Sequence, residues 1–191
     1  CGTAMGRRLW RRWLDRPLTS VPAIKERQEA VGYLKDNFIK RQGLRDRLGA
    51  TYDLERLAGK LDLGQGNARD LLSLAHSLNQ IDPIKDLLDD DEAPALIQSL
   101  YKQLDPLEDL REKITAALID PAPLKITEGG LIREGYSETL DQLKEAAENG
   151  QQWLLDLEAK EREATGIKNL KIGYNRVFAY YIEVSKGQVD K

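Results

Sequence analysis

Residues 137–165, SETLDQLKEAAENGQQWLLDLEAKEREAT, contain no proline and carry apolar or small residues at helical spacing. These residues step alternately by three and four positions: Leu140, Leu143, Ala147, Gly150, Leu154 and Leu157. Such spacing forms one seam along an α-helix, as in a heptad repeat. About 28 residues at 1.5 Å each give a rod of roughly 42 Å, too long to be buried in a small domain. We therefore expect a long protruding helix, N-capped by Ser137.

The sequence before this helix predicts a multi-helical core. Helix starts are expected where a capping residue precedes proline or an apolar run: at Ser20, at Asn67 with Asp70 in a capping box, at Asp82 before Pro83 and at Asp105 before Pro106. Buried positions are expected at Ile24, Val31 and Leu34 of the helix after Ser20. Residues 119–135 hold two prolines and three glycines, which predicts an irregular connector with room for two short strands.

The first helix has a more ambiguous pattern. Leu9, Trp10, Trp13 and Leu14 share one face, and arginines occupy the other. The simplest interpretation is a tryptophan face in the core and an arginine face that meets solvent or neighbouring acids. The alternatives are that the arginines bind phosphate or an acidic partner, or that the tryptophans bind a membrane surface.

After Gly166 the sequence becomes typical of β-strands. Residues 170–185, LKIGYNRVFAYYIEVS, are rich in β-branched and aromatic side chains, and Asn175 with Arg176 forms a plausible two-residue turn. Basic residues alternate there with aromatic ones, which indicates either a nucleic-acid-binding ribbon or a hairpin with an ordinary solvated face. The expected fold class is thus mainly α: a multi-helical core, a long helix and a small β-hairpin.

Charge is distributed unevenly along the chain. The 191 residues carry a net charge of -3 and are 41% hydrophobic and 32% charged, enough apolar content for a folded core. Residues 1–16 hold five arginines against Asp15, and residues 166–191 hold five lysines or arginines against two acids. Residues 82–112 and 136–164 are acidic. The basic ends are therefore the segments expected to meet phosphate.

Several classes of protein are disfavoured by what the sequence lacks. No Gly-Lys-Ser or Gly-Lys-Thr motif occurs, so the glycines of residues 63–67 predict a helix-breaking turn rather than a phosphate loop. His76 is the only histidine, and the acidic residues 89–92 lack calcium-loop spacing and predict a solvated loop. No combination of nucleophile, base and metal ligands suggests an enzyme, and we expect no cofactor or metal in this chain.

The cysteine and hydropathy patterns indicate the cellular compartment in which the protein is expected. Cys1 is the only cysteine, which excludes an internal disulfide and fits the cytoplasm. No run approaches the roughly 18 apolar residues that a membrane span needs, so no membrane partner is expected. The chain has no initiator methionine and stops within a strand-like run, which we interpret as a piece of a longer protein.

Four blocks resemble the MutS family of bacterial DNA mismatch-repair proteins. They are TAMGRRLWRRWLDRPL, then YDLERLAGKL with NARDLL, then GGLIREGYSETLDQL, and finally EREATGIKNLKIGYNRVFAYYIEVSKG. Their order and their spread over nearly the whole chain make the resemblance specific. It implies a core domain at 1–136, a lever helix at 137–165 that couples a distant ATPase domain to a DNA clamp, and the beginning of that clamp at 166–191.

The resemblance also implies function and partners. The parent protein would be a homodimeric mismatch sensor of the bacterial cytoplasm and nucleoid that uses ATP and Mg²⁺ in an ATPase domain absent from this chain. Its complete clamp would hold double-stranded DNA by backbone contacts, and downstream repair proteins would bind it. The DNA-facing candidates in this chain are Lys171, Asn175, Arg176 and Lys186.

Two alternatives to this interpretation remain. One is the MutS paralogue group that has the core and lever without a clamp, and the other is a helical interaction module that never touches DNA. Because the clamp is incomplete here, the leucines of the long helix at 140, 143, 154 and 157 are expected to lack a cover. Exposed apolar residues of this kind predict self-association or local disorder near the rod.

Overall fold

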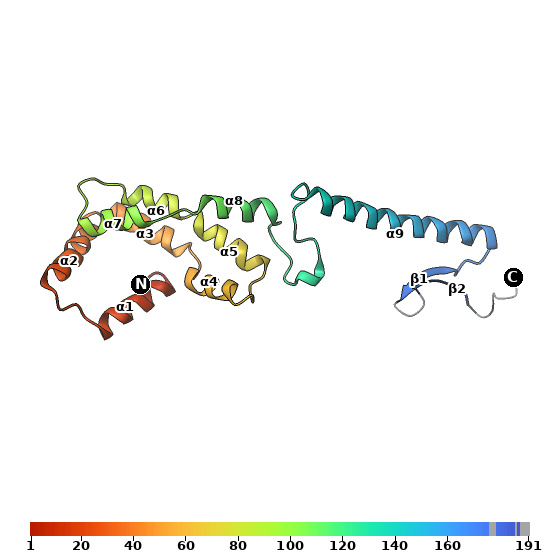
Figure 1. Ribbon diagram of the computed structural model, residues 1–191, viewed down its shortest axis with the longest axis horizontal. Helices are drawn as coiled ribbons and strands as arrows, with labels where there is room; N and C mark the ends of the chain where they lie inside the picture. The colour runs from red at the N-terminus through yellow and green to blue at the C-terminus, as the bar shows by residue number, and fades with distance from the viewer. Residues whose placement is uncertain (176–178, 186, 188–191) are drawn as a thin grey trace. The chain divides into compact units, whose positions relative to one another are not determined.

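A computed structural model describes residues 1–175, 179–185 and 187. The chain divides into two compact units, 1–133 and 134–191 (Figure 1). The first unit contains α1 (Ala4–Asp15), α2 (Val21–Asp36), α3 (Phe38–Gly49), α4 (Leu54–Asp62), α5 (Ala68–Leu78), α6 (Ile81–Leu88), α7 (Ala95–Gln103), α8 (Glu108–Ala117) and the 3-10 turn η1 (Ile126–Glu128). The second contains α9 (Glu138–Thr165), β1 (Lys171–Asn175) and β2 (Ala179–Glu183). The expected class, mainly helical with a small hairpin, is confirmed.

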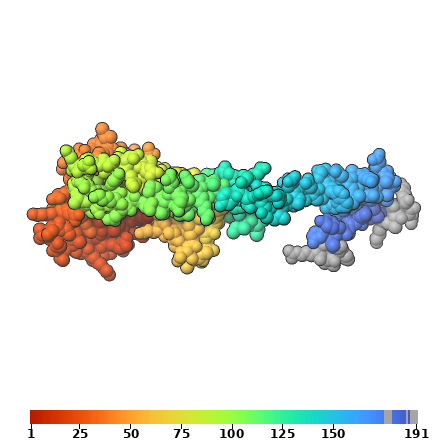
Figure 2. Space-filling model, turned by 45° about the horizontal axis from the view of Figure 1, so that its top comes forward, coloured from red at the N-terminus to blue at the C-terminus, as the bar shows by residue number. Residues whose placement is uncertain are grey.

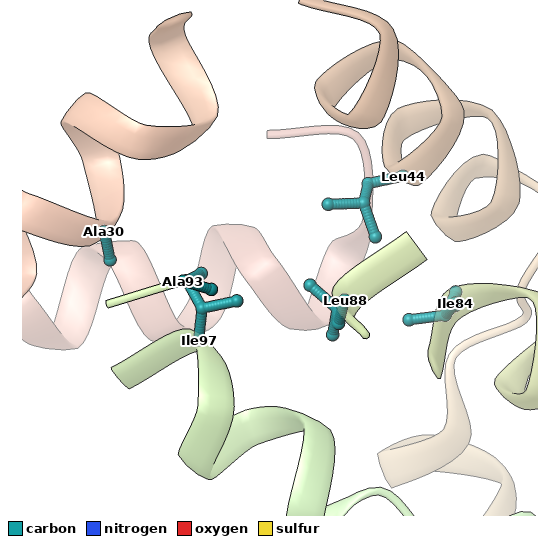
Figure 3. Close-up of a cluster of buried hydrophobic side chains, with 6 residues drawn as sticks. All are labelled: Ala30, Leu44, Ile84, Leu88, Ala93 and Ile97. Carbon is teal, nitrogen blue, oxygen red and sulfur yellow. The ribbon is translucent and has the colours of Figure 1, made fainter. Parts of the chain in front are cut away.

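The first unit has two small hydrophobic cores. One lies among α2, α3, α6 and α7, where the buried side chains converge in Figure 3: Ala30, Leu44, Ile84, Leu88, Ala93 and Ile97. The other lies between α5 and α8 and includes the connector after α8: Ala68, Leu72, Ala75, Ile114, Leu118 and Ala122. Both cores combine alanines with larger leucine and isoleucine side chains.

Local capping explains several of the helix starts. Asn67 and Asp70 form the expected capping box, in which each side chain accepts the backbone N–H of the other residue, at 3.0 and 2.9 Å. Ser137 caps α9 by accepting the N–H of Leu140 at 3.4 Å. Ser20 occupies the N-cap position of α2, but its side chain makes no capping hydrogen bond. All three predicted positions are confirmed.

The two aspartate-proline starts were predicted wrongly. Helix α6 begins at Ile81 with Gln80 as its N-cap, so Asp82 lies inside the first turn and pairs with Arg111 at 3.0 Å. Helix α8 begins at Glu108, because the side chain of Asp105 accepts the N–H of Leu107 at 2.9 Å and forms a turn before the helix. Leu107 then takes a left-handed conformation with φ 48°.

Two predicted buried faces also require correction. The apolar residues of α1 are exposed rather than in a core: Leu9, Trp10, Trp13 and Leu14. Val31 of α2 is exposed as well, and Ala30 takes the buried position while Tyr33 and Leu34 pack against the core. Both errors have one cause, since periodicity identifies an apolar face but not the surface that it meets.

The connector between α8 and α9 contains one isolated β-bridge instead of two short strands. Leu118 pairs with Ile132 across this bridge, next to a backbone hydrogen bond of 2.8 Å from Arg133 N–H to the Ala117 carbonyl. The rest of residues 119–135, all of which the structure describes, holds turns and η1. The bridge attaches the end of the first unit to its second core, which Leu131 and Ile132 also contact.

Candidate nucleic-acid interface

The second unit joins a 28-residue helix to an antiparallel hairpin through two polar side chains near the end of α9. Arg162 donates from Nε to the Leu170 carbonyl at 2.7 Å, and Glu158 accepts the N–H of Ile172 at 2.9 Å. The two side chains also form an ion pair at 2.5 Å, one helical turn apart. This arrangement connects the last turns of the helix directly to the backbone at the start of β1.

Two buried side chains and one hydrogen bond lie at the base of the hairpin. Ile167 and Leu170, in the short link after Gly166, are buried. Asn169, before β1, donates from its amide to the hydroxyl of Ser185, after β2, at 2.7 Å, so this bond joins the two strands at the open end of the hairpin. Gly166 itself has φ 68° and ends α9 in the left-handed conformation that glycine adopts most readily.

The strand register defines two faces of the hairpin. Ile172 pairs with Ile182 and Tyr174 with Tyr180, so these side chains share one face. The rings of Tyr174 and Tyr180 lie 5.0 Å apart at an angle of 56°. On the other face Lys171 pairs with Glu183 and Gly173 with Tyr181.

The four predicted DNA-facing residues have different outcomes. Lys171 begins β1, is exposed and lies opposite the acidic Glu183. Asn175 ends β1 opposite Ala179, so it belongs to the strand, and the expected two-residue turn at Asn175 and Arg176 is wrong. Arg176 and Lys186 lie outside the described residues. DNA contact by all four therefore stays a prediction.

Sequence patterns did not predict the apolar groove between α9 and the hairpin. It has a volume of about 450 Å³ and is lined by apolar side chains and one glycine: Gly150, Trp153, Leu154, Leu157, Ile172, Tyr180, Tyr181 and Ile182. In Figure 2 the described strand residues (blue) lie against the C-terminal half of the helix. The apolar side chains of this groove offer phosphate neither positive charge nor hydrogen-bond donors.

Several charged residues of the first unit form ion pairs with one another. Lys40 and Tyr33 donate to the carboxylate of Asp90 at 2.8 and 2.5 Å and lower the pKa of Asp90 to about 2. His76 lies 3.1 Å from Asp120 at the surface. Within the described ranges no three acidic, histidine or cysteine side chains gather as a metal site would require.

The arginine face of α1 pairs with neighbouring acids, as the simplest interpretation predicted. Arg8 binds the carboxylates of Asp53 and Glu55, which raises the pKa of Arg8 and lowers that of Asp53. Arg12 lies 3.9 Å from Glu55. Among the helices that the structure describes, none is long and apolar enough to cross a membrane.

Comparison with known proteins identifies the relatives of this chain. The family model for MutS domain III matches residues 1–179. Proteins described as DNA mismatch repair protein MutS are similar over nearly the whole chain: that of Lactobacillus gasseri is 49% identical over 189 residues, 99% of this chain, and that of Bacillus subtilis is 47% identical over 190 residues, 98% of this chain. In both cases the match spans only 22% of the relative's length.

Proposed function

Because the chain belongs to the MutS domain III family, we propose that it is the helical scaffold and lever of a DNA mismatch-recognition protein. In this proposal residues 1–136 form the core domain, residues 137–165 the lever and residues 166–191 the beginning of a DNA clamp. The division into compact units at 133 and 134 lies close to the first of these boundaries.

The observation that carries the proposal is the junction between α9 and β1. A lever must pass a displacement at one end to a load at the other, which requires a stiff rod and a stiff joint. Glu158 and Arg162 each combine their mutual ion pair with a hydrogen bond to the backbone at the start of the hairpin. Charge-assisted hydrogen bonds are stronger than neutral ones, so this joint favours common movement of the helix and β1.

The hairpin is the proposed DNA-contacting part. Lys171, Asn175, Arg176 and Lys186 would meet phosphates without reading bases, a mode that gives affinity with little sequence preference. The presence of β1 and β2 favours this proposal over the clamp-less paralogue alternative. A helical interaction module without DNA remains the alternative that a binding experiment must separate.

The remaining functions belong, in this proposal, to the longer protein of which such a domain is one part. ATP hydrolysis with Mg²⁺, assembly into a homodimer and binding of downstream repair proteins are assigned to it. We propose that it works in the bacterial cytoplasm on nucleoid DNA, and that the present chain has no enzymatic activity of its own. The 22% coverage of the relatives leaves ample length for an ATPase domain.

DNA contact is tested by duplex binding in a salt series, with the chain placed in a full-length MutS protein. Replacing Lys171, Arg176 and Lys186 together by glutamine should make the plot of log K against log salt less steep, by about 0.9 for each phosphate that these residues neutralise. The control is Lys125→Gln in the first unit, which should leave the slope unchanged. An unaltered slope in the triple variant would overturn the assignment of DNA contact to these residues.

Coupling through the joint needs a separate experiment. Glu158→Ala removes both the ion pair and the acceptor of the Ile172 N–H, so it should weaken the effect of nucleotide on DNA residence time while ATP turnover without DNA persists. Glu148→Ala, at an exposed position of the same helix, is the matched control. Equal nucleotide effects in the two variants would argue against a lever.

A further inference from the structure

Helix α1 lies at the surface of the first unit: none of its twelve residues, all of which the structure describes, is buried, as is also true of α4. Arg8 contacts Asp53 and Glu55 at the start of α4, and Arg12, one turn later, lies 3.9 Å from Glu55. Near the end of α1, Trp13 lies under Arg27 of α2, with 3.7 Å between the guanidinium carbon and the ring centre. Figure 1 shows α1 between these two helices.

The Arg8 contact uses nearly every donor of the guanidinium. Nη1 and Nη2 each donate to a different oxygen of Asp53, both at 2.7 Å. Nε and Nη2 also donate to one oxygen of Glu55, at 2.8 and 2.5 Å. This paired geometry with two carboxylates is specific to arginine, because a lysine ammonium has no planar fork.

Asp53, which accepts two of the Arg8 hydrogen bonds, is itself held in place by its neighbours. Asp53 is the N-cap of α4 and accepts the N–H of Arg56 at 3.3 Å. The preceding residue, Tyr52, donates its N–H to the hydroxyl of Ser77 at 2.9 Å, and Ser77 is fully buried in α5. Asp53 is thus fixed from both sides, whereas α1 contributes no buried residue to either core.

We propose that α1 is a detachable strap, held in place by the Arg8 contact and released as one piece while the rest of the first unit stays folded. Regions with few buried apolar contacts open with the smallest free energies. A helix of twelve residues is marginal on its own in water, so the released strap unwinds. Because the contact is electrostatic and partly exposed, rising salt promotes release.

Hydrogen exchange of the 191-residue chain, followed by mass spectrometry, tests the strap. Arg8→Gln should accelerate exchange of the α1 amides by roughly tenfold or more, since it removes hydrogen bonds between charged groups, with no change in α5 or α6. Arg11→Gln is the control, because Arg11 lies on the same helix and makes no ion pair with any residue that the structure describes. Asp53→Asn should act like Arg8→Gln, as asparagine keeps the cap of α4 but removes the charge.

Hydrogen exchange at different salt concentrations distinguishes a strap held by electrostatic contacts from a helix held by packing. In the unsubstituted chain, exchange of α1 should accelerate between about 0.05 M and 1 M salt, as the screening length falls, and in Arg8→Gln the acceleration should be much smaller, since only the longer Arg12–Glu55 pair remains. Protection of α1 that is the same with and without Arg8 would overturn the proposal. Loss of protection in α5 and α6 together with α1 would overturn it as well, because the strap would then be part of the cooperative core.

Discussion

The ring of Tyr181 covers Gly173 on the opposite strand so closely that a Cβ atom at residue 173 would lie 2.6 Å from the ring carbon Cζ. Gly173→Ala should therefore displace the ring or bend β1, at a cost of about 1–3 kcal/mol that is typical of overpacking. NMR or hydrogen exchange of the β1 and β2 amides should show a loosened hairpin beside unchanged helices of the first unit. Gly150→Ala is the control, since a Cβ there meets nothing within 4 Å, and normal strand protection in Gly173→Ala would contradict the expectation.

Ser77 offers a test of a buried polar contact. Its hydroxyl accepts the Tyr52 N–H at 2.9 Å and donates to the Ser73 carbonyl at 2.8 Å. Ser77→Ala leaves the Tyr52 N–H without this partner and should lower the free energy of unfolding by about 1–3 kcal/mol. Urea denaturation measures the loss, with Ser73→Ala as the control because the Ser73 carbonyl survives that change. Equal stability of the two variants would show that water replaces the hydroxyl.

Asp90 should make the first unit sensitive to acid. Lys40 and Tyr33 lower its pKa from 3.8 to about 2 in the folded protein. The folded state therefore binds the proton less readily than the unfolded state does. The stabilisation from Asp90 is fully present above pH 4 or so and is lost as the pH falls toward 2.

Comparison of the protein with Asp90→Asn isolates this contribution. The urea midpoint of the variant should lie below that of the unsubstituted protein at neutral pH, and the difference should shrink as the pH falls from about 4 to about 2. Asp89→Asn, at the exposed neighbouring position, should show no such narrowing. A difference that is constant with pH would mean that Asp90 acts through packing rather than charge.

Exposed apolar residues on α9 should make the chain associate with itself. The hairpin partly covers Leu154 and Leu157, but Leu143 remains 63% exposed. Sedimentation velocity over a concentration series should detect association that Leu143→Lys weakens and Gln151→Lys leaves intact. A monomer at every concentration would contradict this expectation.

The parts of the fold that sequence predicted well depend on residues close together in the chain. The long helix follows from a proline-free seam and the cap at Ser137, and the start of α5 follows from Asn67 and Asp70, three residues apart. The same local reasoning failed at Asp105, because an aspartate side chain can also close a turn before a helix begins. A capping residue therefore predicts a helix more securely than it predicts the first residue of that helix.

Features that depend on distant residues could not be predicted. Nothing in the sequence near Arg8 identifies Asp53 as its partner, 45 positions away. Likewise, the alternation in the hairpin predicted two strands but not that Ile172 would turn toward Leu154 and Leu157. For the candidate site, sequence placed Lys171 on a strand correctly, while its cross-strand neighbour Glu183 emerged only from the register.

The length of helix α9 also determines the direction in which the hairpin points around the helix axis, relative to Ser137 at the other end. Each residue of an α-helix rotates the chain by about 100° around the helix axis and advances it by 1.5 Å along that axis. Because Glu158 and Arg162 bind the hairpin backbone to the last turns, inserting one residue in the N-terminal half would swing the hairpin about a quarter of a turn relative to Ser137. An insertion of seven residues would nearly restore its direction, with a deviation of about 20°. For the proposed lever, the length changes that keep the direction of the hairpin are those of near-integral numbers of turns.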